Sequence, residues 1–205
     1  MKRYDHQYCP IASSLGLVGE RWTLLVVREL FAGPKRYTDL AEHLPGIGTN
    51  ILAARLKELE TAGLVERRKL PPPAASSVYE LTETGRALRP VLHELARFGA
   101  KYLGPPPPDA LEEGWLLGAL DLAVSPLAGG MTVAFKIGGE EASLVDGRAV
   151  PGLAAVADAV VEGDPAGFYH LFVDGALDAV QIDGDVRAVE HLVAAFRPSG
   201  VPLPA

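Results

Sequence analysis

The chain has 205 residues, with 19 basic and 26 acidic side chains, and its formal net charge is -7 at pH 7. A single cysteine, Cys9, excludes an internal disulfide, and no apolar run reaches the ~18 residues of a membrane-spanning helix. The start "MKRYDHQYCP" does not resemble a secretory signal, so we expect a soluble, cytoplasmic protein without a membrane partner.

The charge is divided unequally between the two halves of the chain. Residues 1–104 hold 15 basic and 11 acidic side chains, a balance of +4, whereas residues 105–205 hold 4 and 15, a balance of -11. Attraction to polyphosphate acts within a Debye length of about 8 to 10 Å, so the local charge matters more than the total. "GPPPPD" at 104–109 is a semi-rigid break, and we expect two domains, residues 1–104 and 110–205.

The first elements expected are helices. "VGERWTLLVVRELFAG" places Trp22, Val26 and Leu30 at helical intervals and ends at a Gly-Pro breaker. In "RYTDLAEHLPG", Thr38 is able to cap a short second helix that ends at Pro45. These two elements are expected to be an amphipathic helix and the first helix of a helix-turn-helix.

A third helix begins near residue 48. Thr49 or Asn50 is able to cap it, "ILAARLKELETAG" carries a stripe of leucines at 52, 56 and 59, and Gly63 suits the left-handed residue that closes a helix. Two short helices joined by a tight turn are the helix-turn-helix arrangement.

Two strands are expected next. "LVERRKL" and "VYELT" alternate apolar and polar residues, and "PPPAASS" joins them into a hairpin. The first strand carries Arg67, Arg68 and Lys69 in succession, either for phosphate contact or as a solvated surface. The pattern predicts a winged helix-turn-helix.

"GERWTLLVVRELFAGPKRYTDLAEHLPGIGTNILAARLKELETAGLVERR", followed by "VYELTETGRAL" and preceded by Cys9-Pro10, resembles the HxlR family of bacterial winged-helix transcriptional regulators. The resemblance covers residues 8–103. It implies a homodimer that binds an inverted repeat in double-stranded DNA, with one recognition helix per subunit in the major groove. The wing departs from the family's Pro-x-Val-x-Tyr pattern because Ser77 precedes Val78.

The outer face of the third helix is the expected base-reading surface. With the leucines turned inward, Thr49, Asn50, Ala53 and Lys57 point away from the core. Asn50 is the natural adenine reader, and Thr49 and Ala53 suit a thymine methyl or a phosphate. Arg55 has two alternatives, a phosphate contact or an ion pair with a carboxylate such as Glu58 or Glu29.

Further phosphate contacts are expected at the start of the second helix. Lys35, Arg36 and Thr38 lie where free N–H groups favour an anion, although simple solvation of the loop is the alternative. The next segment, residues 86–103, is a predicted helix whose apolar stripe is wide for its own domain, so a partner subunit is expected to cover it. Trp22 and residues 11–17 are expected to join that dimer contact.

The second half is predicted to be an α+β domain. "MTVAFKIGGEEASLVDGRAV" predicts strands with hairpin turns at Gly138-Gly139 and Asp146-Gly147, and "VPGLAAVADAVVEGD" predicts a helix up to Gly163. "DAVQIDGDVRAVEHLVAAF" predicts a strand and an amphipathic helix. The order of elements over residues 130–197 resembles the sterol-carrier-protein-like fold, which implies an apolar cavity for a hydrophobic small-molecule effector.

The candidate ligand-binding residues of this half are apolar or aromatic. They are Trp115, Phe135, Leu144, Phe168, Tyr169 and Phe172. Trp115 and Tyr169 are preferred because a buried ring with a polar tip needs a partner, whereas the alternative for the whole set is ordinary core packing.

Cys9 suggests a different switch. Some HxlR-type regulators sense oxidants or electrophiles through a cysteine at this position, and a thiolate before a helix with Lys2, Arg3 and His6 nearby is favoured for such reactivity. The alternative is a small buried residue at the dimer contact.

The pattern gives no cofactor, no metal site and no enzyme motif. We therefore expect a homodimeric DNA-binding regulator, more in keeping with a repressor, whose C-terminal domain binds a hydrophobic effector. The alternatives are a redox- or electrophile-sensing regulator switched through Cys9, and a lipid carrier with a winged-helix docking module.

Overall fold

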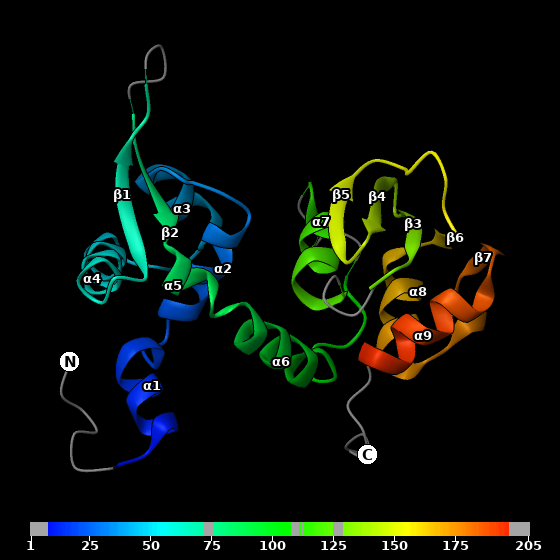
Figure 1. Ribbon diagram of the computed structural model, residues 1–205, viewed down its shortest axis with the longest axis horizontal. Helices are drawn as coiled ribbons and strands as arrows, with labels where there is room; N and C mark the ends of the chain where they lie inside the picture. The colour runs from blue at the N-terminus through cyan, green and yellow to red at the C-terminus, as the bar shows by residue number, and fades with distance from the viewer. Residues whose placement is uncertain (1–7, 72–75, 108–110, 112, 125–128, 197–205) are drawn as a thin grey trace. The chain divides into compact units, whose positions relative to one another are not determined.

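The computed structural model describes residues 8–71, 76–107, 111, 113–124 and 129–196, and the chain divides into two compact units, residues 1–92 and 93–205 (Figure 1). The predicted mixture of helices and sheets is confirmed. The division falls inside the helix α6, Arg89–Ala100, because the start of α6 belongs to unit 1 whereas Ala100 packs against the core of unit 2. The expected domains, 1–104 and 110–205, remain a prediction.

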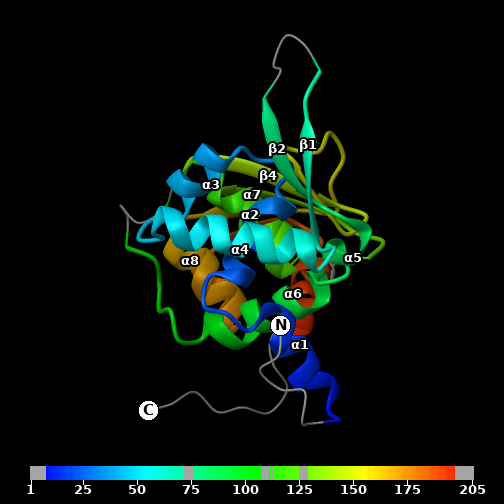
Figure 2. The same ribbon diagram turned by 90° about the vertical axis from the view of Figure 1, so that its left-hand side faces the viewer.

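Unit 1 contains the predicted helices followed by the predicted hairpin. Its elements are α1 (Pro10–Val18), α2 (Thr23–Phe31), α3 (Tyr37–His43), α4 (Thr49–Thr61), β1 (Val65–Lys69), β2 (Ser77–Leu81) and α5 (Glu83–Arg86). The strands are antiparallel, with Val65 opposite Leu81 and Lys69 opposite Ser77. Figure 2 looks onto this unit and shows α4 lying across it, with the hairpin projecting beside α4.

The core of unit 1 consists of leucines and valines from α2, α3, α4 and the hairpin. Its most buried members are Val26, Val27, Leu30, Leu40, Leu44, Leu52, Leu56, Leu59, Leu64, Val65, Val78 and Leu81. The predicted inward stripe of α4 is confirmed. Each such side chain contributes roughly 1.5 to 3 kcal/mol relative to its exposed state, so this packing fixes which face of α4 remains at the surface.

Unit 2 is a mixed sheet with helices. Its elements are α7 (Trp115–Ala119), η1 (Leu120–Val124), β3 (Thr132–Ile137), β4 (Glu140–Val145), β5 (Arg148–Pro151), β6 (Ala159–Gly163), α8 (Pro165–Tyr169), η3 (His170–Asp174), η4 (Leu177–Ala179), β7 (Gln181–Gly184) and α9 (Val186–Phe196). The strand order is β5-β4-β3-β6-β7. β3 and β6 are parallel, and the other neighbours are antiparallel.

The two hairpin turns of unit 2 are confirmed. Gly138 and Gly139 have φ values of 59° and 87°, and Asp146 and Gly147 have φ values of 48° and 75°. Positive φ at both central residues matches the twist of the flanking strands, which explains the preference for Gly-Gly and Asp-Gly.

One prediction for unit 2 was wrong. The helix expected to end at Gly163 is replaced by the strand β6, preceded by residues 152–158 without a helix. Ala159 and Val161 are buried, and β6 lies between β3 and β7. The alternating burial of a central strand therefore outweighs the helical spacing of alanines and valines. The sterol-carrier-like identity of the unit remains a prediction.

Candidate nucleic-acid interface

The turn between α3 and α4 sets the start of α4. Gly46 has a φ of 88°, which favours glycine, and the Ile47 N–H donates to Leu44 O at 3.1 Å. The Tyr37 hydroxyl donates to Thr49 O at 2.7 Å and ties the first turn of α4 to α3. Gly48 is the N-cap residue, so the expectation that Thr49 or Asn50 caps α4 was wrong.

The outer face of α4 presents the expected residues. Thr49, Asn50, Ala53 and Lys57 are all exposed. Residues 49, 53 and 57 follow one another at intervals of four, so their side chains lie on one face of the helix. Asn50 in the first turn presents an amide, which offers both a donor and an acceptor to a base edge.

Ile51 is a surface residue that the sequence reasoning missed. Its side chain is 46% exposed in the first turn of α4, although it is large and apolar. Since residue 51 lies outside the leucine stripe, its spacing alone was sufficient to place it on the surface. An exposed apolar group there suits contact with a thymine methyl.

Arg55 is held by carboxylates. Its guanidinium lies 2.7 Å from Glu58 and 3.8 Å from Glu20, and the Arg55 side chain is only 16% exposed. Of the two carboxylates expected from the sequence, Glu58 is a partner of Arg55 and Glu29 is not. Glu20, in the connection between α1 and α2, is a second partner that was not expected. The arrangement favours a positioning role for Arg55 over a phosphate contact.

Lys35 has partners within the unit. Its ammonium lies 3.3 Å from His43 Nδ1 and 4.0 Å from Glu29 Oε2, and its side chain is 17% exposed. Backbone hydrogen bonds in both directions join Lys35 to Tyr79 of β2. Lys35 therefore links the segment before α3 to the wing.

The N-terminus of α3 already contains a carboxylate. Arg36 is the exposed N-cap residue, and its N–H donates to Asp39 Oδ2 at 2.9 Å. This backbone hydrogen bond is the main cause that lowers the pKa of Asp39. Thr38 is exposed within the first turn and is not the cap, contrary to expectation. The Arg36 N–H group is thus already bound to Asp39.

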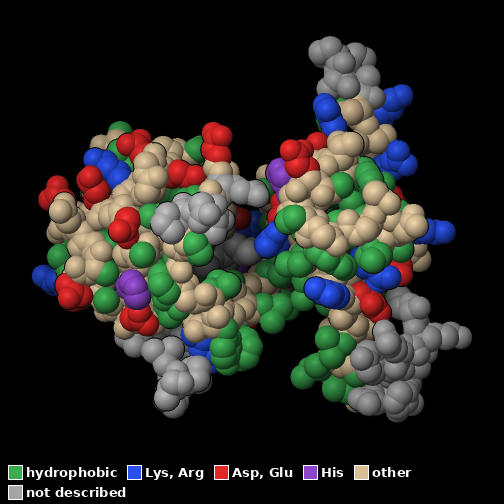
Figure 3. All heavy atoms as spheres, turned by 180° about the vertical axis from the view of Figure 1, so that it is seen from behind, with side chains coloured by type: hydrophobic (Ala, Val, Ile, Leu, Met, Phe, Trp, Pro, Cys, Tyr) green, Lys and Arg blue, Asp and Glu red, His purple; other side chains and the backbone are tan. Residues whose placement is uncertain are grey.

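The three basic residues of the wing lie on two different faces of the hairpin. Arg67 lies opposite Tyr79 in the register, with its guanidinium 5.9 Å from the centre of the Tyr79 ring. Arg68 contacts Glu80 through two hydrogen bonds, one of 3.1 Å, and this pairing lowers the pKa of Glu80. Lys69 is exposed, and by strand alternation it shares a face with Arg67. Figure 3 shows basic side chains projecting from the hairpin.

The base of the wing is fixed by a small network. Gly63 has a φ of 69° and, with Leu64 N donating to Leu59 O at 3.0 Å, closes α4 as predicted. The Thr82 hydroxyl donates to Gly63 O at 2.7 Å and accepts from Gly85 N at 3.1 Å. Gly85 is buried against Leu64. The end of α4, the end of β2 and α5 are therefore joined.

The predicted ligand residues of unit 2 separate into core and edge. Phe135, Leu144, Phe168 and Phe172 are buried in the core cluster, where the Phe168 and Phe172 ring centres are 4.9 Å apart. Trp115 is half-buried, and its ring centre lies 5.6 Å from that of Phe168 in an edge-on arrangement.

Tyr169 is also half-buried, and its ring centre lies 5.5 Å from that of His170. Cys9 is a half-buried free thiol at the N-cap of α1. Among the described residues, no group of three or more His, Cys, Asp or Glu side chains is arranged to hold a metal ion. No helix in the described part of the chain is long and apolar enough to cross a membrane.

Three helices, a tight turn before the exposed helix α4 and a basic hairpin define a winged helix-turn-helix protein. The family model of the HxlR-like helix-turn-helix matches residues 17–106. The regulator YodB of Bacillus subtilis is 40% identical over 98 residues, which cover 47% of this chain and 88% of YodB. The chain belongs to the HxlR-like helix-turn-helix family and is a helix-turn-helix transcriptional regulator.

Other relatives match the same half of the chain. The HTH-type regulator sll1512 of Synechocystis is 39% identical over 95 residues, covering 46% of this chain and 70% of the relative. Reduced YodB from B. subtilis aligns in structure with a TM-score of 0.42 and 38% identity, covering 49% of this chain and all of that chain. The redox regulator HypR in its oxidised form aligns with a TM-score of 0.42 and 30% identity, covering 44% of this chain and 94% of the HypR chain.

Proposed function

We propose that the protein is a homodimer that binds an inverted repeat in double-stranded DNA. The observation that carries this is the exposed face of α4 with Thr49, Asn50, Ala53 and Lys57, next to a wing with exposed Arg67 and Lys69. A helix held by its leucines presents its N-terminal residues to the major groove, and a basic hairpin reaches the adjacent phosphates.

The homodimer is supported by apolar side chains left at the surface of two helices. On α1, Ile11 is 72% and Leu15 is 46% exposed. On α6, Val91, Leu95 and Phe98 are 46%, 45% and 60% exposed, on the same side of the helix. Large apolar groups in this number mark an interface, and a second copy of the chain satisfies the two-fold symmetry of an inverted repeat.

The experiment selects bound duplexes from a random library with the full chain, and sedimentation measures the mass of the free protein and of the complex. We expect an inverted repeat occupied by two chains, with an affinity that falls steeply as salt is raised, by a log-log slope near -0.9 per neutralised phosphate. A lipid carrier with a docking module would select no sequence and show no such slope.

We further propose that unit 2 is a sensing domain for an apolar effector. The half-buried Trp115 packs against the core that contains Phe168 and Phe172, and Tyr169, the residue after Phe168, is half-buried as well, so an apolar molecule would enter there. Native mass spectrometry of freshly purified protein tests this: an adduct released on denaturation supports it, and an empty chain that gains no mass with apolar probes contradicts it.

The second candidate is a thiol switch at Cys9, favoured because this free cysteine is partly exposed and lies at the N-cap of α1, next to the proposed dimer surface. Alkylation of Cys9 would then abolish DNA binding, and the Cys9→Ser variant would keep binding DNA and be indifferent to the reagent. Unchanged DNA affinity after complete alkylation rules the switch out.

A further inference from the structure

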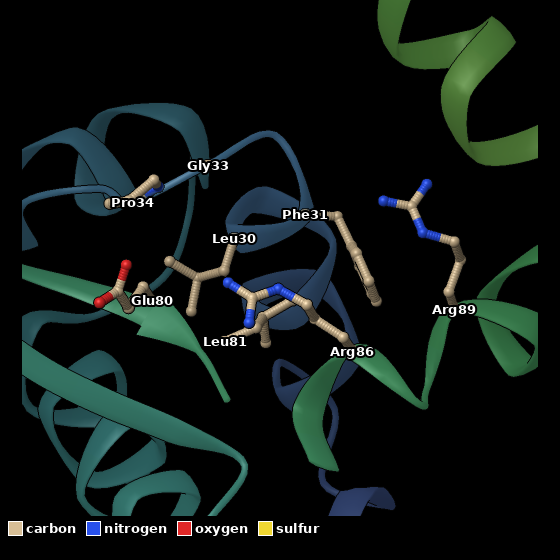
Figure 4. A pocket seen from close by; sticks show the side chains of 8 residues that line it. All are labelled: Leu30, Phe31, Gly33, Pro34, Glu80, Leu81, Arg86 and Arg89. Atoms are coloured by element: carbon tan, nitrogen blue, oxygen red, sulfur yellow. The ribbon is translucent and has the colours of Figure 1, made fainter. Parts of the chain in front are cut away.

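Unit 1 contains a pocket that the proposed DNA contacts do not use. It has a volume of about 110 Å³ and lies where the end of α2, the strand β2, the end of α5 and the start of α6 meet. It is lined by Leu30, Phe31, Gly33, Pro34, Glu80, Leu81, Arg86 and Arg89 (Figure 4).

The wall of the pocket combines apolar side chains with two cations, Arg86 and Arg89, and the carboxylate of Glu80. Leu30 and Leu81 are 3% and 2% exposed and belong to the core. Figure 4 shows the Arg86 side chain beside Leu30 and Leu81, with its guanidinium directed toward the Glu80 side of the pocket. The Arg89 guanidinium lies 4.6 Å from the centre of the Phe31 ring. Arg86 is therefore the cation best placed to receive an anion over the two leucines.

Glu80 is paired mainly with Arg68. The hydrogen bonds from Arg68 are the main cause that lowers the pKa of Glu80, and the charge of Arg86 is a smaller one. Since Arg68 already compensates the carboxylate, an exposed guanidinium at Arg86 is available to a second anion. A guanidinium binds a carboxylate through two parallel hydrogen bonds, which a neutral group cannot replace.

The size of the pocket selects a short ligand. A cavity of about 150 Å³ holds benzene, so a volume of about 110 Å³ suits a chain of three or four carbons. We propose that this pocket binds a small aliphatic monocarboxylate, of the size of butyrate, with its carboxylate on Arg86 and its chain on Leu30 and Leu81.

Such a ligand would be linked to the wing. Glu80 lines the pocket and also holds Arg68 of β1, so a second carboxylate on Arg86 changes the charges that surround the Arg68–Glu80 pair. An effect on DNA affinity follows from this link and rests on the proposed DNA-binding function; the binding of the carboxylate itself does not.

The experiment is a titration of the full chain, ¹³C-labelled in its leucine methyl groups, with sodium butyrate at constant ionic strength. We expect saturable shifts of the Leu30 and Leu81 methyl signals. The neutral analogue butyramide should produce none, and Arg86→Gln should weaken butyrate binding by about tenfold or more. Arg148→Gln removes an exposed cation from unit 2 and is the matched control, expected to bind butyrate as the unaltered protein does.

Three results overturn the proposal: no saturable methyl shift with butyrate, equal shifts with butyramide, or unchanged butyrate affinity in Arg86→Gln. Failure of the protein to select a DNA sequence refutes the proposed function but leaves the methyl shifts as an independent readout.

Discussion

Replacing Gly85 by alanine is expected to destabilise the base of the wing. A Cβ atom at Gly85 would lie 2.0 Å from Leu64 O and 3.1 Å from a Leu81 methyl, and real Cβ contacts are essentially never shorter than 3.0 Å. The backbone must shift by about 1 Å to relieve the overlap, at a cost of about 1 to 3 kcal/mol for overpacking. The shift also strains the Thr82 hydrogen bonds, each contributing about 1 kcal/mol.

The net loss should be about 2 to 3 kcal/mol, because alanine restricts the unfolded chain and returns about 0.5 to 1 kcal/mol. The chain has two tryptophans, so the Trp115→Phe background leaves Trp22 as a fluorescence probe of unit 1. Urea unfolding in that background should show a midpoint lowered by roughly 1 to 2 M.

The matched control is Gly16→Ala in α1, where an added Cβ meets nothing within 4 Å. A helical glycine in open space should be improved by alanine, by about 0.5 to 1 kcal/mol. The two substitutions are chemically identical and should change stability in opposite directions. Equal midpoints for the two variants would refute the reasoning from the Leu64 contact.

Three further outcomes are expected. Asn50→Ala should weaken binding to the selected duplex by about 1 to 3 kcal/mol and leave nonspecific DNA binding unchanged, whereas Arg67→Ala should weaken specific and nonspecific binding alike. Competition assays with random DNA measure the two kinds of binding, and an equal loss of specific and nonspecific binding in Asn50→Ala would contradict this prediction. Phe98→Glu should convert the dimer to a folded monomer in sedimentation, because a charge cannot be buried there without a partner, and an unchanged dimer would exclude that face of α6. Because the pKa of Glu80 is lowered, its pairing with Arg68 stabilises the fold above the unfolded pKa of about 4.5, and this contribution is lost as the pH falls through the pKa of the folded state. An NMR titration of Arg68→Gln should therefore show the pKa of Glu80 moved upward. An unmoved pKa would show that the pair with Arg68 is not the cause of the lowering.

Local patterns predicted much of the fold. The leucine stripe of α4 predicted its buried face, and Gly63 predicted its end, because helical spacing and left-handed φ are properties of a few neighbouring residues. Prediction failed for β6, where Ala159 and Val161 fit a helix equally well until neighbouring strands were available. The N-cap of α4 was also misplaced by one or two residues, since Gly48 needs no side-chain oxygen to begin a helix.

The candidate site divides in the same way. The sequence by itself determined that Thr49, Asn50 and Lys57 lie on the outer face of α4, because the helical period fixes a face once the leucines are buried. The local spacing also offered the Arg55–Glu58 pair as one of two alternatives, whereas only the tertiary structure decided that Arg55 faces Glu20 and that Arg68 is held by Glu80. Arg68 meets Glu80, 12 residues away, across a hairpin. This ion pair depends on where the two strands are brought together, which the spacing of neighbouring residues does not determine.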